Sequence, residues 1–256
     1  MRLTTLVLAG CVLLAPWLTV DAKDEALAKA IGASHRSANF IERDKYRKPQ
    51  EELEFLGIKP NMTVVEISPG GGYWTEILAP YLKGQGTYYT AVSSRQIDSW
   101  KKKLDAAPEI YGNVKISQLE DAIAPAGSAD MVLTFRNVHN WMARGNADEM
   151  FASFYKALKP GGILGVEEHR ASDAVPQDPK AANGYVRQDY TIQLAEKAGF
   201  KFVSSSELLA NPKDTKDWPR GVWTLPPTLA LGDQDREKYL AIGEADNFLL
   251  KFQKPQ

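Results

Sequence analysis

Three consecutive glycines stand between a short β-branched run and apolar residues at helical spacing. Residues 63–67 are typical of a strand, 68–72 of a tight loop and 73–78 of a helix start. Glycine lets a backbone approach a ligand closely, and a helix N-terminus presents unpaired N–H groups and a positive dipole end. The pattern predicts a cradle for a nucleotide-type cofactor.

Alternating apolar runs and helical segments predict further strands, which requires a largely parallel, doubly wound α/β sheet. A Lys-Pro-Gly-Gly turn at 159–162 is expected before the fifth strand. The predicted strands after the first are 87–92, 114–117, 130–135, 163–167, 200–204 and 247–252.

Ligands of such sheets bind beyond the carboxyl ends of the strands, near the point where strand order reverses. That rule selects polar residues from several loops. They are Glu66, Ser68, Pro69, Gly70, Gly71 and Gly72 after the first strand, Ser93 after the second, Glu120 and Asp121 after the third, Arg136, Asn137, His139 and Asn140 after the fourth, and His169 after the fifth.

His139 is the predicted catalytic base, with Asn140 and His169 as catalytic partners, because an imidazole accepts a proton near neutral pH. The alternative is that His139 and Asn140 only satisfy buried loop backbone. A metal held by both histidines and Glu167 or Glu168 is a further alternative. Its spacing matches no compact metal signature, so the sequence predicts no metal site.

Arg36 and Arg187 are predicted to hold an anionic substrate, provided that the N-terminal segment folds over the cleft. Tyr185 flanks Arg187 and is assigned to the same pocket. The alternative reading of both arginines is solvated surface charge.

The chain has 31 basic and 32 acidic residues, which gives no electrostatic footprint for nucleic acid or an anionic membrane. A small-molecule substrate is therefore expected.

Residues 1–22 have the basic start, apolar core and small-residue cleavage site of a signal peptide. This pattern predicts export, to the periplasm in a bacterium, and no membrane span in the mature chain. An uncleaved anchor and lipid attachment at Cys11 are the alternatives.

Residues 23–256 are predicted to form one domain. Residues 23–60 read as an N-terminal helical cap, and 207–244 as a Pro/Trp-rich insertion before the last strand, too apolar for a disordered linker. The sequence leaves open whether this insertion is a cap or a contact surface.

The order of 64–72, 130–141 and 158–164 resembles class I S-adenosylmethionine-dependent methyltransferases. The runs 68–76, 135–141 and 213–219 are most similar to a group of exported bacterial predicted methyltransferases. This resemblance implies a Rossmann-like seven-stranded sheet ending in an antiparallel hairpin, S-adenosylmethionine as the cofactor, and methyl transfer to a small molecule outside the cytosol.

The resemblance also implies roles for residues at matching positions. Glu66 would orient the methionine end of the cofactor, and residues 68–72 would form the cofactor-binding loop, with Arg136 and Asn137 nearby. Ser68 stands where a glycine is usual, which is tolerable if its φ stays negative. The carboxylate usual at the end of the second strand is replaced by Ser93. Glu120 and Asp121 are the nearest candidates for an adenine or ribose contact.

Two other functions stay open. One is a non-catalytic binding protein of the same fold that recognises a nucleotide-like or anionic ligand. The other is a nicotinamide dehydrogenase, which is disfavoured because Thr75 replaces the third glycine of the dinucleotide loop.

Overall fold

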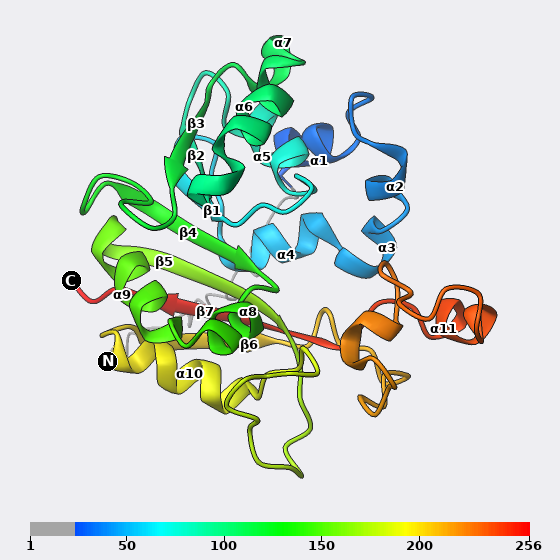
Figure 1. Cartoon of the computed structure of the whole chain (residues 1–256). Helices are drawn as coiled ribbons and strands as arrows, with labels where there is room; N and C mark the ends of the chain where they lie inside the picture. The colour runs from blue at the N-terminus through cyan, green and yellow to red at the C-terminus, as the bar shows by residue number, and fades with distance from the viewer. Residues whose placement is uncertain (1–23) are drawn as a thin grey trace, which may run out of the picture.

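The computed structural model describes residues 24–256 (Figure 1). The predicted signal peptide, its cleavage after Ala22 and the lipid attachment at Cys11 lie outside the described residues. Between residues 24 and 256, no helix has both the length and the apolar character needed to traverse a bilayer.

Seven strands form one sheet in the order β3-β2-β1-β4-β5-β7-β6. Neighbouring strands from β3 to β5 pair in parallel, whereas β7 is antiparallel to both β5 and β6. The predicted Rossmann-like sheet with a closing antiparallel hairpin is confirmed. The strands are β1 (Thr63–Ile67), β2 (Thr87–Val92), β3 (Val114–Gln118), β4 (Ala129–Phe135), β5 (Leu158–His169), β6 (Lys201–Ser206) and β7 (Asn247–Gln253).

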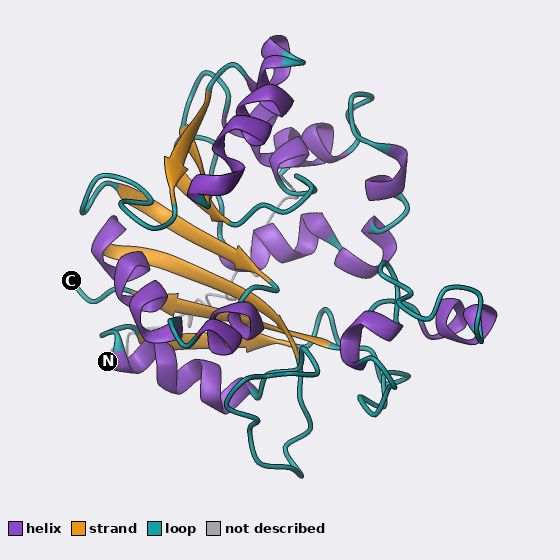
Figure 2. Ribbon diagram, viewed as in Figure 1, coloured by secondary structure: helices purple, strands orange, loops and turns teal. Residues whose placement is uncertain are grey.

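Helices cover both faces of this sheet (Figure 2). The helices between residues 24 and 256 are α1 (Glu25–Ile31), α2 (Ala38–Ile41), α3 (Asp44–Arg47), α4 (Pro49–Leu56), α5 (Thr75–Leu82), α6 (Ile97–Asp105), α7 (Pro108–Tyr111), α8 (Val138–Arg144), α9 (Ala147–Ala157), α10 (Gln188–Lys197) and α11 (Arg236–Ile242), with 3-10 helices η1 (Ser94–Gln96) and η2 (Gly221–Thr224).

Adjacent residues of β1 show how the two layers are built, because successive side chains of a strand point to opposite faces. Val64 packs in a buried cluster with residues of α1, α4, α5 and α6. Val65 packs in a second cluster with residues of α8, α9 and α10. Buried apolar area on both faces fixes the sheet as the central layer.

The turn predicted at 159–162 is wrong, because these residues belong to β5. Leu158 pairs with Ala129, and the ladder resumes at Met131 and Ile163 with a register shift. Residues 159–162 of β5 therefore form an irregularity in the β4–β5 ladder, and Gly161 has a φ of 79° there.

Helices α2 and α3 and the insertion lie beyond the carboxyl ends of the strands, whereas α1 and α4 pack on one face of the sheet. In Figure 1 the insertion, drawn orange to red, lies beside α3. A small buried cluster anchors it, made of Val222, Leu225, Tyr239, Ala245 and Tyr185. The insertion is therefore packed onto the domain at the end where ligands of this architecture bind.

Candidate functional site

A cavity of about 270 Å³ opens at the carboxyl ends of β1, β4 and β5. Three parts of the chain wall it: the N-terminal helices, the loops that follow the strands, and the insertion. Its lining is Phe40, Arg43, Arg47, Glu66, Ile67, Ser68, Pro69, Gly70, Gly71, Tyr73, Trp74, Phe135, Arg136, Asn137, His139, His169, Val222, Trp223, Pro226, Pro227, Thr228 and Ala245. Because Val222 and Trp223 line it, the insertion caps the cavity.

The glycine loop borders the cavity through Ser68 to Gly71. The condition under which Ser68 would be tolerated, a negative φ, is not met, since its φ is 49°. Gly70 has a φ of 59°, and a Cβ placed on it would meet no atom within 4 Å. Gly72 does not line the cavity; a Cβ there would lie 2.8 Å from Cε of Lys103, so its role is close packing against α6.

Glu66 is buried beneath this loop. Its Oε2 accepts hydrogen bonds from Oγ1 of Thr75, at 2.7 Å, and from the hydroxyl of Tyr88. These bonds tie β1 to the start of α5. Burial raises the pKa of Glu66 to about 7, although both hydrogen bonds and the charge of Arg47 oppose the shift. The carboxyl is therefore poised to be partly neutral at physiological pH.

The residues predicted for the adenine and ribose end lie outside the cavity lining. Oγ of Ser93 donates to Oε1 of Gln96 at 2.8 Å, and Oε2 of Glu120 accepts from the backbone N–H of Ser94 at 3.0 Å. Glu120 thus reaches the loop after β2, where the usual carboxylate is missing. Glu120 and Asp121 are both exposed.

Two residues after β4 lie as predicted, at the cavity. Arg136 has a φ of 60°, a left-handed backbone unusual for arginine. The Asn137 side chain donates to the carbonyl oxygens of Ile67 and Phe135 at 3.1 and 3.2 Å, which joins the ends of β1 and β4. Asn140 is not among the lining residues, so the structure gives no support to its catalytic role.

Both predicted histidines line the cavity, and their rings lie 5.5 Å apart between centroids. Nδ1 of His139 lies 2.9 Å from Oε1 of Glu168. Both oxygens of this fully buried carboxylate also accept backbone N–H groups, from His139 at 3.1 Å and His169 at 2.8 Å. The pKa of Glu168 is lowered: burial by itself would raise it, but the charge and hydrogen bond of His139 outweigh burial. Burial lowers the pKa of His169 to about 4, which makes that ring neutral.

A network of arginines and carboxylates beside the histidines was not predicted. Arg43 and Arg136 both bind Glu244 of the insertion, with closest distances of 2.5 and 2.9 Å. Arg47 binds Glu167 at 2.8 Å and stacks over Tyr73, 4.3 Å from the ring centroid. Burial would raise the pKa of Glu244, but the hydrogen bond from Arg43 and the charge of Arg136 keep it lowered. The N-terminal helices are thereby fastened to the insertion and to β5.

Glu52 adds to this network without hydrogen bonds of its own. Its side chain is fully buried, and neither carboxyl oxygen has a partner among the described residues. Burial and the nearby charge of Glu167 raise its pKa well above the ordinary value. With Glu52 neutral, three arginines face two carboxylates, so this wall of the cavity carries excess positive charge.

The predicted substrate residues do not meet at the cavity. Arg36 is held by Asp44 at 2.6 and 2.8 Å, and Arg187 by the exposed Asp189 at 2.6 and 2.9 Å. The Tyr185 hydroxyl donates to Asp214 at 3.0 Å. Sequence reasoning missed Arg43 and Arg47, which line the cavity beside the predicted Arg136.

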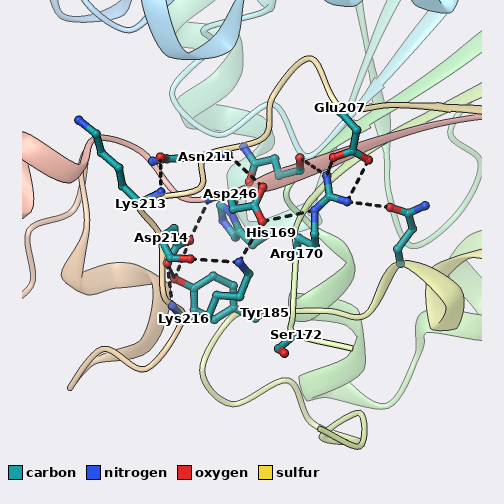
Figure 3. A network of polar contacts seen from close by, with 12 residues as sticks. His169, Arg170, Ser172, Tyr185, Glu207, Asn211, Lys213, Asp214, Lys216 and Asp246 are labelled. Atoms are coloured by element: carbon teal, nitrogen blue, oxygen red, sulfur yellow. Dashed lines mark hydrogen bonds and ion pairs between the residues drawn. The ribbon is translucent and has the colours of Figure 1, made fainter. Parts of the chain in front are cut away.

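Asp214 fastens the insertion to the domain (Figure 3). This buried carboxylate accepts from the Tyr185 hydroxyl, from Nε1 of Trp218 at 2.7 Å and from the backbone N–H of Asp246 at 2.9 Å. Lys216 and Arg170 in turn reach Asp246 at 3.0 and 3.4 Å. The motif at 213–219 therefore holds the cap in place and contributes no group to the cavity.

Residues 65–164 match a family described as a methyltransferase domain. This range runs from β1 into β5 and includes the glycine loop and His139. A comparison with curated proteins finds no match.

Solved structures share the fold at low identity. A SAM dependent methyltransferase from Aquifex aeolicus is 15% identical, with a TM-score of 0.58 over 83% of this chain and 93% of its own. A putative sarcosine dimethylglycine methyltransferase from Galdieria sulphuraria is 12% identical, with a TM-score of 0.56 over 84% and 85%. The [4+2]-cyclase SpnF is 16% identical, with a TM-score of 0.57 over 82% and 80%.

The chain therefore has the class I methyltransferase fold. The domain match over residues 65–164 and the shared fold imply S-adenosylmethionine as the cofactor. The likeness to a cyclase means that the fold by itself does not define the reaction.

Proposed function

We propose that the protein transfers the methyl group of S-adenosylmethionine to a nucleophile on a small molecule held in the cavity. The observation that carries this proposal is the His139–Glu168 pair at 2.9 Å, which faces the same cavity as the glycine loop. A carboxylate behind an imidazole orients the ring and stabilises its protonated form, as in general-base catalysis.

The residues present fit the cofactor in part. The backbone from Ser68 to Gly71 offers a cradle in which the Cβ position of Gly70 is open. Arg43 and Arg136 can face a carboxylate, the group at the methionine end. The end of β2 departs from the expected pattern, because no carboxylate stands at Ser93. When bound, S-adenosylmethionine supplies an electrophilic methyl group.

His139 would take the proton of the acceptor at Nε2, because its Nδ1 is engaged by Glu168. Phe135, Trp74 and Trp223 line the cavity and exclude water from it. In-line methyl transfer then requires chiefly that the acceptor is positioned against the methyl group.

A second candidate is binding without catalysis of a nucleotide-like or anionic ligand. The arginine-rich wall and the absent ribose carboxylate at Ser93 favour it. We also propose export, on the basis of the leader-like residues 1–22, and kinship with exported bacterial methyltransferases, on the basis of the motifs around 68–76 and 213–219.

Calorimetry with S-adenosylmethionine and S-adenosylhomocysteine tests the cofactor assignment. Gly70→Val should abolish binding, because a branched side chain would enter the cradle. Gly127→Val is the matched control, since Gly127 has a φ of 63°, an equally open Cβ position and no place in the lining. No heat with either compound at millimolar concentration would contradict methyl transfer, and binding of another nucleotide instead would favour the second candidate.

A further inference from the structure

The ring orientations of His139 and His169 are both fixed by the protein. Nδ1 of His169 lies 2.8 Å from Oδ1 of Asn247. Nδ2 of the same amide donates to Oε1 of Glu167 at 2.9 Å, so the amide oxygen must face the histidine. His169 therefore carries its proton on Nδ1 and a lone pair on Nε2.

His139 has the same tautomer for a similar reason. The Glu168 carboxylate receives two backbone N–H groups besides Nδ1 of His139, which marks it as an ionised acceptor. Nδ1 of His139 therefore carries a proton, and the nitrogen left free to accept a proton or to bind an ion is Nε2. Neither Nε2 has a hydrogen-bond partner within residues 24–256, and both residues line the cavity.

Imidazoles whose Nδ1 atoms are held by a carboxylate and by an amide oxygen form the usual arrangement of metal-binding histidines. One ligand atom from each of His139, Glu168 and His169 lies within 4.8 Å of the other two. For comparison, ligands of one tetrahedral zinc ion lie about 3.3 Å apart. The oxygens of Glu168 are already taken, so we assign it to orienting His139.

Glu168 supplies a negative charge at the pair, although the arginine wall of the same cavity opposes a cation. Glu168 lies directly behind His139, while the nearby Arg47 and Arg136 are paired with Glu167 and Glu244. Imidazole ligands favour ions such as Zn²⁺, Co²⁺, Ni²⁺ and Cu²⁺ over Mg²⁺ or Ca²⁺.

We propose that Nε2 of His139 and Nε2 of His169 together bind one divalent transition-metal ion of the Zn²⁺ class, with its remaining positions open to water or the acceptor. The acceptor would then be a molecule with an oxygen or sulfur able to bind the ion, which lowers the pKa of such a group. His139 would act as a ligand in that state. This site does not depend on methyl transfer.

Co²⁺ titration tests the proposal on metal-free protein that carries no polyhistidine tag and no cofactor. We expect one ion per chain, with visible d–d absorption and Zn²⁺ displacing Co²⁺. His139→Gln and His169→Gln should each weaken binding at least about 100-fold, and Glu168→Gln about 10- to 100-fold. His35→Gln is the control, because His35 is the only other histidine of the chain and bonds the Glu76 carbonyl oxygen.

Thermal unfolding of each variant verifies that it is folded. Binding that persists in both cavity variants, or that is lost in His35→Gln, would overturn the proposal, as would the absence of any binding at millimolar Co²⁺. Calorimetry with S-adenosylmethionine measures cofactor binding in a separate experiment. A protein that binds no metal ion can therefore still pass or fail the test of methyl transfer.

Discussion

Arg47 and Glu167 form an ion pair of 2.8 Å in which both side chains are almost completely buried. Arg47 ends α3, and Glu167 lies near the end of β5, 120 residues later. The pair joins the N-terminal helices to the sheet directly at the cavity. Removing one partner of such a pair leaves an uncompensated buried charge, which costs far more than the pair itself contributes.

Arg47→Met should therefore lower the free energy of unfolding by about 3 kcal/mol, measured by urea denaturation. Lys197→Met removes the exposed pair with Asp148 and should cost less than about 1 kcal/mol. Equal losses in the two variants would show that the buried pair has no special role.

Ser68→Gly should raise the free energy of unfolding by about 1 kcal/mol, because glycine adopts a positive φ without strain. No hydrogen bond of the Ser68 side chain to a described residue is lost. Ser93→Gly is the control: Ser93 has a φ of −64°, so glycine there should destabilise through chain entropy and through loss of the hydrogen bond to Gln96. A loss of stability in Ser68→Gly would refute the strain argument.

Glu66→Gln should change how stability depends on pH. The Glu66 pKa of about 7 in the folded protein lies above the ordinary value of 4.5, so the unfolded chain loses this proton at a lower pH than the folded protein does. Stability from the protonated carboxyl is complete below pH 4.5 and is lost as the pH rises through 7, by up to about 3 kcal/mol. Relative to the native protein, the glutamine variant should therefore become more stable as the pH rises over this range.

Urea denaturation at several pH values measures that difference. Glu149→Gln, at an exposed position of α9, is the control and should differ from the native protein by a nearly constant amount. A difference for Glu66→Gln that is equally flat would contradict the raised pKa.

Asp214→Asn should loosen the insertion while the sheet stays folded. An amide has one acceptor oxygen where the carboxylate has two, so some of the donors around it lose their partner, at about 1–3 kcal/mol each. Hydrogen exchange across 207–244 should accelerate about 10- to 100-fold, with β1 and β4 unchanged. Asp217→Asn, at an exposed position in the same loop, should leave exchange unaltered.

Local patterns were sufficient to predict the sheet and the cavity edge. The glycine loop, Arg136, Asn137 and the two histidines follow strands directly, so topology alone places them together. The arginine network could not be predicted from the sequence, because Arg43 and Glu244 are 201 residues apart and no local pattern indicates that they are in contact. Arg36 was misassigned for the opposite reason: its partner Asp44 is only eight residues away, and it satisfies the charge before any ligand can.

The placement of β7 sets an order for folding. This strand, Asn247–Gln253, inserts between β5 and β6, and Glu244 just before it receives Arg43 and Arg136. The sheet can therefore close, and the cavity acquire its complete wall, only after β7 has been synthesised. Contacts of such long sequence separation slow folding. Until then one edge of β5 and one edge of β6 lack their partner strand, and exposed edges of this kind favour aggregation of folding intermediates.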